Sequence, residues 1–338
     1  MFSGMLEVSG TIDLAQFWNI GESDADTVKV TLAGTNAFRF SPHTGAPAAV
    51  THAFDDAVVK GKVSKPAIDS QNRIVIRLQG IDAPELHYRP LAPTIHKKKP
   101  TAQQRAKFNA SNGNFRQFFG ETAAVHLAAF LAKAGATPIP CTVRTGVDDP
   151  SDVFDTYGRL VGDIYVTING TEKDVNLWLC QEGWAFPTFY SSMTDGEITT
   201  LIGLSQQARQ AKRGIWKYAS SDLSVFDRTL LFRNKGAIDA TADKGKVYLP
   251  KLYRRRSTYG VAKIAGIASG SFKNYLKALP DACFETSDLL ANGITVATPH
   301  LLDEFVNAQS QFLAAPADLV FQEAASRVVD SKGKPAEW

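Results

Sequence analysis

Residues 76–86, IRLQGIDAPEL, combine a cation and two carboxylates in one strand and the turn that ends it. Arg77 closes an apolar run, and Asp82 and Glu85 flank Pro84, whose ring restricts the backbone of the turn. Charged groups gathered in this way are a costly means of building a core, because each must be paired or hydrogen-bonded once it is buried. The segment therefore predicts the start of a site that binds a metal ion and an anion together.

Two other segments contain complementary groups. Residues 23–27, SDADT, and residues 155–159, DTYGR, each form a predicted turn that leads into a strand. Their carboxylates suit a hard cation such as calcium or magnesium, and arginine suits phosphate, which its planar guanidinium binds in a bidentate way. Hydrolysis of a phosphodiester needs an activated water, a polarised phosphorus and stabilisation of developing charge. The three segments together could supply these.

The elements that carry these segments are predicted from hydrophobic periodicity. Alternating apolar residues and β-branched side chains indicate four strands, at Thr27–Leu32, Arg73–Leu78, 141–144 and 158–167. Apolar residues at helical spacing, each run followed by a glycine, indicate three helices, at 120–134, 174–182 and 197–213. Because the strands precede most of the helices, a small β-barrel with helices packed on it is the expected fold.

Two long stretches interrupt the predicted barrel. Residues 33–71 contain several prolines and glycines, and we interpret them as a long hairpin or loop insertion. Residues 87–114 are polar and rich in lysine and proline, as expected of an exposed loop. Residues 1–218 are therefore predicted to form one domain with two insertions.

The composition of the chain changes after Trp216. Residues 219–227 are typical of a linker, and residues 219–338 are expected to form a mostly helical accessory region. Within this region the patterns predict a strand at 247–249 and helices near 271–279, 299–314 and 316–325. No catalytic constellation is evident in this part of the sequence.

The chain is mildly basic, with a formal net charge of +3 at pH 7. That value is too small by itself to indicate a nucleic-acid partner. Two basic clusters, 96–99 and 254–256, are interpreted as solvated surface when each is considered alone. The arginine cluster could instead extend a track for single-stranded nucleic acid, because Tyr248, Tyr253 and Tyr259 lie around it and aromatic rings stack on bases. A core role for these tyrosines is an equally good interpretation.

The sequence disfavours several classes of protein. Three widely spaced cysteines, Cys141, Cys180 and Cys283, favour buried free thiols over a disulfide framework or structural zinc. No apolar run approaches the ~20 residues of a membrane-spanning helix, so no membrane partner is expected. The first residues lack the basic and apolar regions of a secretory signal. The default expectation is a cytoplasmic protein, and export stays open.

The segments that could do chemistry also resemble a known family. SDADTVKV, IRLQGIDAPE and DTYGRL are similar to the three signature blocks of the staphylococcal nuclease, or thermonuclease, family. EGWA at 182–185 and ARQAKRGIW at 208–216 are similar to later blocks of that family. The resemblance covers roughly residues 10–217, and all blocks keep their order.

This resemblance implies an α+β fold, an OB-type five-stranded β-barrel with packed helices, to which the chain adds its mostly helical C-terminal region. It also implies a calcium-dependent endonuclease that hydrolyses DNA and RNA with little sequence preference. The implied cofactor is Ca2+, and the implied partners are single-stranded DNA and RNA as substrates.

The resemblance assigns roles to metal-binding and water-activating residues. Asp26 and Asp82 match the calcium-binding aspartates, and Ala83 matches a position that binds the metal through its backbone carbonyl. Alanine replaces a threonine that is frequent there, but a backbone ligand does not depend on the side chain. Glu85 matches the carboxylate that activates the attacking water.

Other matched residues would bind substrate. Arg77 and Arg159 match the pair that clamps the phosphate and stabilises the phosphorane-like transition state. Tyr157 matches a nucleotide-contacting tyrosine, and Tyr190, or the adjacent Phe189, matches the second aromatic residue of the nucleotide pocket. A lysine that often holds a terminal phosphate is absent, because threonine follows Asp155.

Two functions remain open from the sequence. An active metal-dependent nuclease needs both aspartates, the glutamate and both arginines, and all five are present. The alternative is a catalytically silent nuclease-like module that binds nucleic acid or another protein. Binding without turnover would distinguish the second function from the first.

Overall fold

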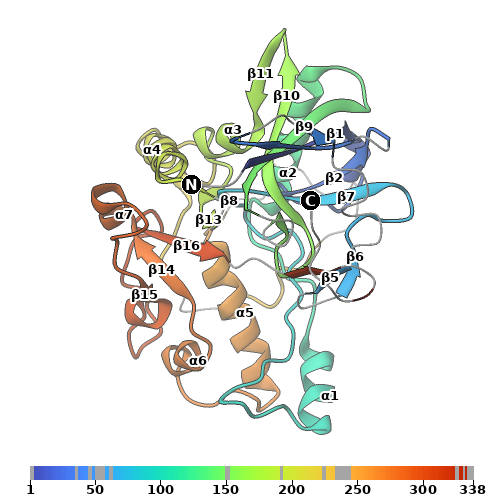
Figure 1. Cartoon of the computed structure of the whole chain (residues 1–338). Coiled ribbons are helices and arrows are strands. Elements are labelled where there is room, and N and C mark those ends of the chain that lie inside the picture. The colour runs from blue at the N-terminus through green and yellow to red at the C-terminus, as the bar shows by residue number, and fades with distance from the viewer. Residues whose placement is uncertain are drawn as a thin grey trace.

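The computed structural model of the chain describes residues 4–34, 37–44, 48–49, 58–60, 64–148, 153–190, 193–222, 226–232, 245–323, 327–329 and 332. Figure 1 shows a barrel of strands in the upper part of the view and C-terminal helices below it. Most of the candidate site residues lie on a barrel strand or on the turns that precede or follow the barrel strands. The fold is therefore described for the elements that position those residues.

Five strands form a closed barrel: β1 (Gly4–Ile12), β2 (Thr27–Leu32), β7 (Arg73–Leu78), β10 (Leu160–Ile168) and β9 (Ile139–Val147). They neighbour one another in that order, and β9 pairs back with β1 to close the ring. Only β7 and β10 run parallel, and the other neighbours in the ring are antiparallel. The barrel confirms the predicted α+β fold of the OB type.

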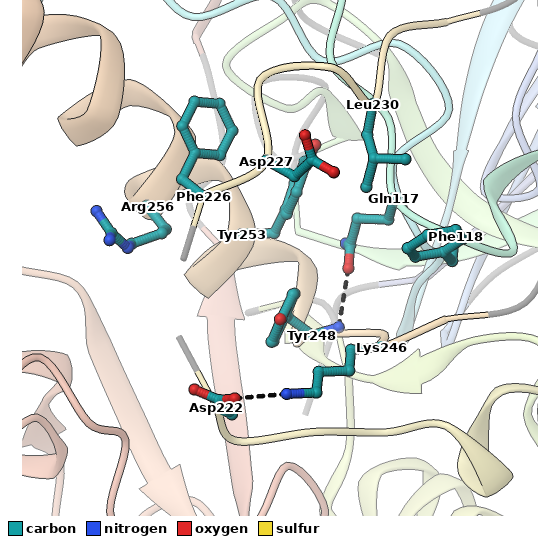
Figure 2. A pocket seen from close by; sticks show the side chains of 10 residues that line it. All are labelled: Gln117, Phe118, Asp222, Phe226, Asp227, Leu230, Lys246, Tyr248, Tyr253 and Arg256. Carbon is teal, nitrogen blue, oxygen red and sulfur yellow. Dashed lines mark hydrogen bonds and ion pairs between the residues drawn. The ribbon is translucent and has the colours of Figure 1, made fainter. Parts of the chain in front are cut away.

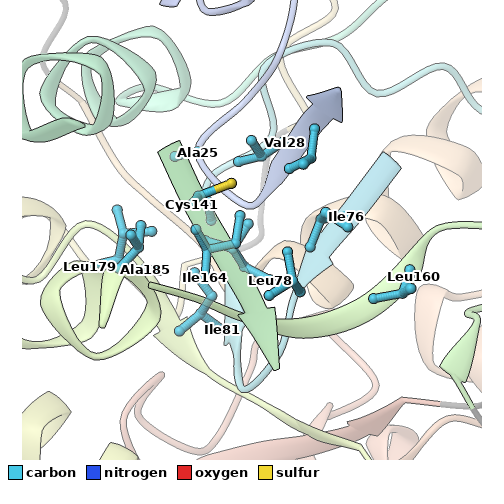
Figure 3. Close-up of a cluster of buried hydrophobic side chains, with 14 of the residues drawn as sticks. Ala25, Val28, Ile76, Leu78, Ile81, Cys141, Leu160, Ile164, Leu179 and Ala185 are labelled. Carbon is cyan, nitrogen blue, oxygen red and sulfur yellow. The ribbon is translucent and has the colours of Figure 1, made fainter. Parts of the chain in front are cut away.

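Alternation along the strands fills the barrel interior. Strands β1 and β9 bury every second residue, because successive side chains point to opposite faces of a strand. Figure 3 shows Val28, Ile76, Leu78 and Ile164 converging in this core from three strands. Full burial of such a side chain contributes about 1.5–3 kcal/mol. The three cysteines are free and buried, as predicted.

The strands and helices predicted within residues 1–218 are confirmed, and two of the strands have the predicted first and last residues. The bounds of β2 and β7 are those expected from the sequence. Helices α2 (Gly120–Leu131), α3 (Val175–Gln181) and α4 (Asp195–Gln210) occupy the expected helical segments. Helix α4 begins two residues early because Thr194 caps it, accepting from the backbone N of Glu197 while the Glu197 side chain reaches back. Strand β11 (Thr171–Asp174) continues the hairpin from β10.

The first insertion is only partly described. Within 33–71, the structure contains β3 (Phe38–Pro42), β4 (Ala48–Ala49), β5 (Val58–Lys60) and β6 (Ser64–Pro66). Strand β3 pairs with β1, and β5 pairs with both β6 and β17 (Arg327–Val329). Residues 35–36, 45–47, 50–57 and 61–63 lie outside the described residues, so the expected loop is not tested there.

The second insertion is more than the exposed loop expected at 87–114. It contains helix α1 (Ala102–Ser111), which buries Phe108 and packs against helix α5 (Pro250–Ile264). Thr101 and Gln104 form a reciprocal capping box at the start of α1. That pattern, threonine followed three residues later by glutamine, is a helix-start signal present in the sequence.

The C-terminal region contains α5, α6 (Phe272–Ala278) and α7 (Thr286–Asn292), which agree with its expected helical character. The helix predicted near 271–279 is confirmed as α6. The predicted strand at 247–249 is wrong, because only Val247 makes an isolated bridge before α5 begins. The helices predicted at 299–314 and 316–325 are also wrong. Those segments hold β15 (His300–Leu301), a 3-10 turn at Leu302–Phe305 and β16 (Leu319–Glu323).

Strand pairing explains the two wrong helices. Strand β16 lies between β14 (Ala282–Glu285) and β13 (Phe189–Tyr190), and β15 pairs with the far side of β14. This sheet satisfies the backbone groups of an apolar run that periodicity alone leaves ambiguous. Because β13 belongs to residues 1–218 and β16 to the C-terminal region, the sheet joins the two parts of the chain.

The two parts also share a hydrophobic core. Phe186 and Trp216 pack in the same buried cluster as Leu252 and Phe321. Within the described residues, no helix combines the length and the apolar character that a membrane crossing requires. The accessory region therefore packs as an integral part of the fold around the barrel.

Candidate active site

Arg77 is the centre of the candidate site. It lies on β7 opposite Thr27 of β2, and the backbone N of Leu78 donates to the carbonyl of Asp26 at 2.9 Å. Its Nη1 lies 2.6 Å from Oδ2 of Asp26, and its Nη2 lies 2.7 Å from Oδ1 of Asp82. A single buried guanidinium therefore bridges the two aspartates that the sequence assigns to a metal.

The turn after β7 places Asp82 and Ala83. Gly80 has a φ of +76°, and a side chain there would also collide with Leu201. The chain then forms β8 (Ile81–Asp82), which pairs with β12 (Phe186–Pro187) and fixes Asp82 opposite Phe186. The backbone N of Ala83 donates to Oδ2 of Asp26 at 3.0 Å. Residues from two distant segments thus meet at one point.

The turn before β10 delivers Arg159 to the same region. Oδ1 of Asp155 accepts hydrogen bonds from the backbone N of Tyr157 and of Arg159, which closes the turn. The Asp155 carboxylate also pairs with the Arg159 guanidinium at 2.6 Å. Nη1 of Arg159 donates to Oγ1 of Thr27 at 2.9 Å, next to Asp26. The three sequence segments with candidate chemistry therefore converge in space.

Glu85 is held by the start of α2. Its carbonyl accepts from the backbone N of Gln117 at 2.8 Å, and the close approach of Gly120 to that carbonyl leaves no room for a side chain. Burial raises the pKa of the Glu85 carboxyl above its ordinary value, the neighbouring Asp82 acts in the same direction, and Arg254 opposes both. A raised pKa suits a group that must exchange a proton with water.

Arg254 is a site residue that the sequence did not reveal. From α5, its Nη1 lies 2.5 Å from Oε1 of Glu85, and its Nη2 lies 3.0 Å from Oδ2 of Asp82. The interpretation of the arginine cluster as solvated surface is therefore wrong, and the C-terminal region contributes one side chain to the site although its sequence shows no catalytic constellation of its own. Arg255 pairs with Asp281, and Arg256 lies over aromatic rings. A run of three arginines was the only signal, and it does not say which of them faces the site.

A second ion pair from the C-terminal region lies beside Arg254. Nζ of Lys251 is 2.7 Å from Oε1 of Glu323 on β16, and Nη2 of Arg254 is 3.8 Å from the same oxygen. Helix α5 and strand β16 therefore build one wall of the site. Neither residue was predicted, because nothing in their local sequence connects them to the barrel.

The site opens into a cavity of about 620 Å³. Arg77, Glu85 and Arg159 border this cavity together with both candidate nucleotide-binding tyrosines. Tyr157 is 42% exposed at the rim, whereas Tyr190 is 4% exposed in the wall. Other cationic side chains on the lining come from the two insertions and α5: Lys65, Arg89, Lys251, Arg254 and Arg255. The cavity thus places cations of several elements around one opening.

The family model described as Staphylococcal nuclease homologue matches residues 75–218. The chain contains a staphylococcal nuclease-like domain. The match includes Arg77, Asp82, Glu85 and Arg159, and the closed five-stranded barrel agrees with it. Strands β1 and β2, with Asp26, precede the matched residues but complete the barrel. No curated protein is similar enough in sequence to count as a match.

The carboxylates of the nuclease-like domain differ in their charge state. Burial, followed by repulsion from Asp26, raises the pKa of Asp24 to about 7. Burial also acts to raise the pKa of Asp26, but the guanidinium groups of Arg77 and Arg159 outweigh it and lower that pKa. Oδ1 of Asp24 is buried and has no hydrogen-bond partner. This oxygen is therefore an acceptor that a donor or a cation could satisfy.

The oxygen donors of the nuclease-like domain suit a hard cation. Carboxylate and backbone carbonyl oxygens are the ligands that calcium prefers, and the unpartnered Oδ1 of Asp24 adds one more such oxygen. In the part of the chain that the structure describes, no three acidic, histidine or cysteine side chains converge as a ready metal site. Asp82 forms ion pairs with the guanidinium groups of Arg77 and Arg254. The carboxylate and carbonyl oxygens of the site are therefore of the kind that binds a divalent cation such as calcium.

A second cavity, of about 240 Å³, lies on another side of α5 (Figure 2). Tyr253 and Arg256 of α5 line it, together with Gln117, Tyr248 and residues of the segment after Trp216. Oε1 of Gln117 accepts from the backbone N of Tyr248 at 2.9 Å. Helix α5 therefore separates the two cavities and presents Arg254 only to the first.

Proposed function

We propose that the chain is a calcium-dependent endonuclease that hydrolyses phosphodiesters of DNA and RNA with little sequence preference. The observation that carries this proposal is the shared cavity, which brings Glu85 to the same opening as Arg77 and Arg159. A base and two phosphate-binding cations at one opening form the minimum set for attack of water on a phosphodiester. The nuclease-like domain supports the same class of reaction.

Glu85 would accept a proton from the attacking water. Its raised pKa makes it a stronger base than an exposed glutamate, and its side chain is still 13% exposed towards the cavity. Arg159, 23% exposed, can bind a phosphate oxygen while it keeps its contact with Asp155. Arg77 is almost fully buried, so it would act on the phosphate from behind the two aspartates.

The metal ligands in this proposal are Asp26, Asp82 and the backbone carbonyl of Ala83. When bound there, Ca2+ would supply positive charge to the phosphate oxygens and lower the pKa of a bound water. Oδ1 of Asp24 would add a further oxygen beside this set, and the Asp24 carboxyl would release its proton more readily as positive charge entered the site.

Single-stranded DNA or RNA is the substrate that the cavity suits best. Its cationic lining can follow a phosphate backbone, which carries no sequence information by itself. Tyr157 is exposed at the rim, where its ring can stack on any base, and Arg159 lies 5.5 Å from the ring centroid. Binding of this kind favours unpaired bases and gives little sequence preference.

Cleavage of a labelled single-stranded DNA with calcium, and with a chelator in its place, tests the proposal. Glu85→Gln should lower the cleavage rate by about 10²–10⁴-fold, which is the usual contribution of a general base. Glu182→Gln is a matched control, because Glu182 is a surface acid paired with Arg213. Equal rates for wild type and Glu85→Gln would refute the proposed role of Glu85.

A nucleic-acid-binding module without turnover is the second candidate. The observation in its favour is that Arg254 already neutralises Glu85. Salt-dependent binding of single-stranded DNA together with no cleavage at any calcium concentration would establish this function instead.

A further inference from the structure

We propose that Arg254 is a built-in cation that occupies the metal position of the site, so that a divalent ion binds only when Arg254 leaves Asp82 and Glu85. The proposal rests on the proposed function for the identity of the metal ligands. It assigns a role to the C-terminal region, which would set the metal affinity of the nuclease-like domain through one side chain.

The contacts of Asp82 show that arginine side chains already occupy both of its oxygens. Its Oδ1 accepts from Arg77 at 2.7 Å and from Arg254 at 3.3 Å, and its Oδ2 accepts from Arg254 at 3.0 Å. Both oxygens of this candidate ligand are therefore engaged by guanidinium groups. The bidentate geometry is the strong form of such a pair, so a metal ion must displace it to reach Asp82.

The charges around Arg254 make its guanidinium and a bound metal ion mutually exclusive. Asp26 and Asp82 share Arg77, whereas Glu85 has its closest cationic contact in Arg254. A divalent ion bound to Asp82 would lie within a few ångströms of the Arg254 guanidinium, which is 3.0 Å from Oδ2 of Asp82, and like charges repel strongly at low dielectric. The two cations are therefore alternatives at this position.

The surroundings of Arg254 allow its side chain to move without its helix. Glu323 provides another acceptor, because its Oε1 is 3.8 Å from Nη2 of Arg254. The backbone of α5 is held independently, by the pair between Arg255 and Asp281 and by the Tyr253 hydroxyl, which donates to the carbonyl of Arg116 at 2.6 Å. A change of side-chain conformation in Arg254, towards Glu323 and the cavity, would free Glu85 and Oδ2 of Asp82, while Arg77 would keep its contact with Oδ1 of Asp82.

Calcium titration by calorimetry, with no nucleic acid present, tests the proposal. Arg254→Gln should bind calcium with a dissociation constant about tenfold to hundredfold lower than that of the wild-type chain, since tenfold corresponds to about 1.4 kcal/mol of lost competition. Arg209→Gln is the matched control, because Arg209 is a surface arginine of α4 that pairs with Asp318 and does not border the cavity. This control should leave the dissociation constant unchanged.

A second variant keeps the test decisive if Arg254→Gln does not fold. Arg254→Lys retains the positive charge but loses the bidentate fork, so its dissociation constant should lie between those of wild type and Arg254→Gln. Unchanged or weaker calcium binding in both variants would overturn the proposal. Chelator-resistant cleavage that disappears in Arg254→Gln would also overturn it, because Arg254 would then replace the metal in catalysis.

The metal titration separates this inference from the proposed nuclease activity. Tighter calcium binding by Arg254→Gln in a chain that cleaves no nucleic acid would support the inference and refute the activity. If neither the wild-type chain nor Arg254→Gln binds calcium, and the wild-type chain still cleaves nucleic acid, the inference is refuted and the nuclease activity stands.

Discussion

Nη1 of Arg254 lies 2.5 Å from Oε1 of Glu85, although 169 positions separate the two residues in the chain. Glu85 belongs to the nuclease-like domain, whereas Arg254 comes from a helix beyond the residues that match the family. The same guanidinium also holds Asp82. The charge of the candidate active site is therefore set by two parts of the chain, and variants on either part should change its behaviour.

Arg159→Lys should lower the rate of cleavage much more than substrate binding. Lysine keeps the charge beside Asp155 but loses the fork that binds a phosphate in a bidentate way. Loss of one preorganised donor to developing charge lowers kcat by about 10²-fold. Steady-state kinetics on a short single-stranded substrate would measure this, with Arg209→Lys on the surface of α4 as control. A change confined to KM would show that Arg159 only binds substrate.

Arg77→Ala should destabilise the fold as well as the site. The substitution leaves Asp26 and Asp82 buried together without the cation that bridges them. Removal of one partner of a buried ion pair costs about 3–5 kcal/mol in the free energy of unfolding. Urea denaturation would measure it, and Arg144→Ala is the control, because its pairs with Glu7 and Glu172 are partly exposed and contribute under ~1 kcal/mol. Equal losses for the two variants would contradict the prediction.

Asp24→Asn should stabilise the metal-free chain in alkaline solution but not in acid. Burial raises the folded-state pKa of Asp24 to about 7 from the 3.8 of an ordinary aspartate, so the folded state binds this proton more tightly than the unfolded state. Wild-type stability is therefore lost as pH rises from about 4 through 7. At pH 8 the variant should gain roughly 2–4 kcal/mol, and at pH 4 the two chains should be nearly equal. Urea unfolding across this range with chelator present would check it, and parallel pH profiles would contradict it.

A chain that ends at residue 218 should not form a stable barrel domain by itself. Removal of residues 219–338 would expose Phe186 and Trp216, which pack in a cluster with Leu252 and Phe321. It would also leave β13 without its partner β16 and the Thr188 hydroxyl without the Phe321 carbonyl to which it donates at 2.7 Å. We expect low solubility, dye binding to exposed apolar surface and loss of cooperative unfolding. A truncated chain with an unchanged melting temperature would refute this.

Local signals account for the parts of the fold that could be predicted. Alternation placed the bounds of Thr27–Leu32 and Arg73–Leu78 correctly because one face of each strand fills the barrel. Glycines at 135 and 183 marked helix ends because they adopt positive φ there, whereas α4 ends at Gln210, before the Gly214 that was expected to stop it. The strand at Leu319–Glu323 was missed, because its partners Phe189–Tyr190 and Ala282–Glu285 are distant in sequence and a short apolar run suits either structure.

The amino-acid sequence by itself determined which residues of the barrel are candidates for chemistry. The reason is that Arg77, Asp82 and Glu85 lie on one strand and its turn, and Asp26 and Arg159 precede the two strands that flank it. Only the tertiary structure decided that Arg254 joins them, because the direction of an arginine on α5 depends on how that helix packs against the barrel. Local pattern carries the identity of the acids and arginines, and long-range packing decides which cation neutralises Asp82 and Glu85.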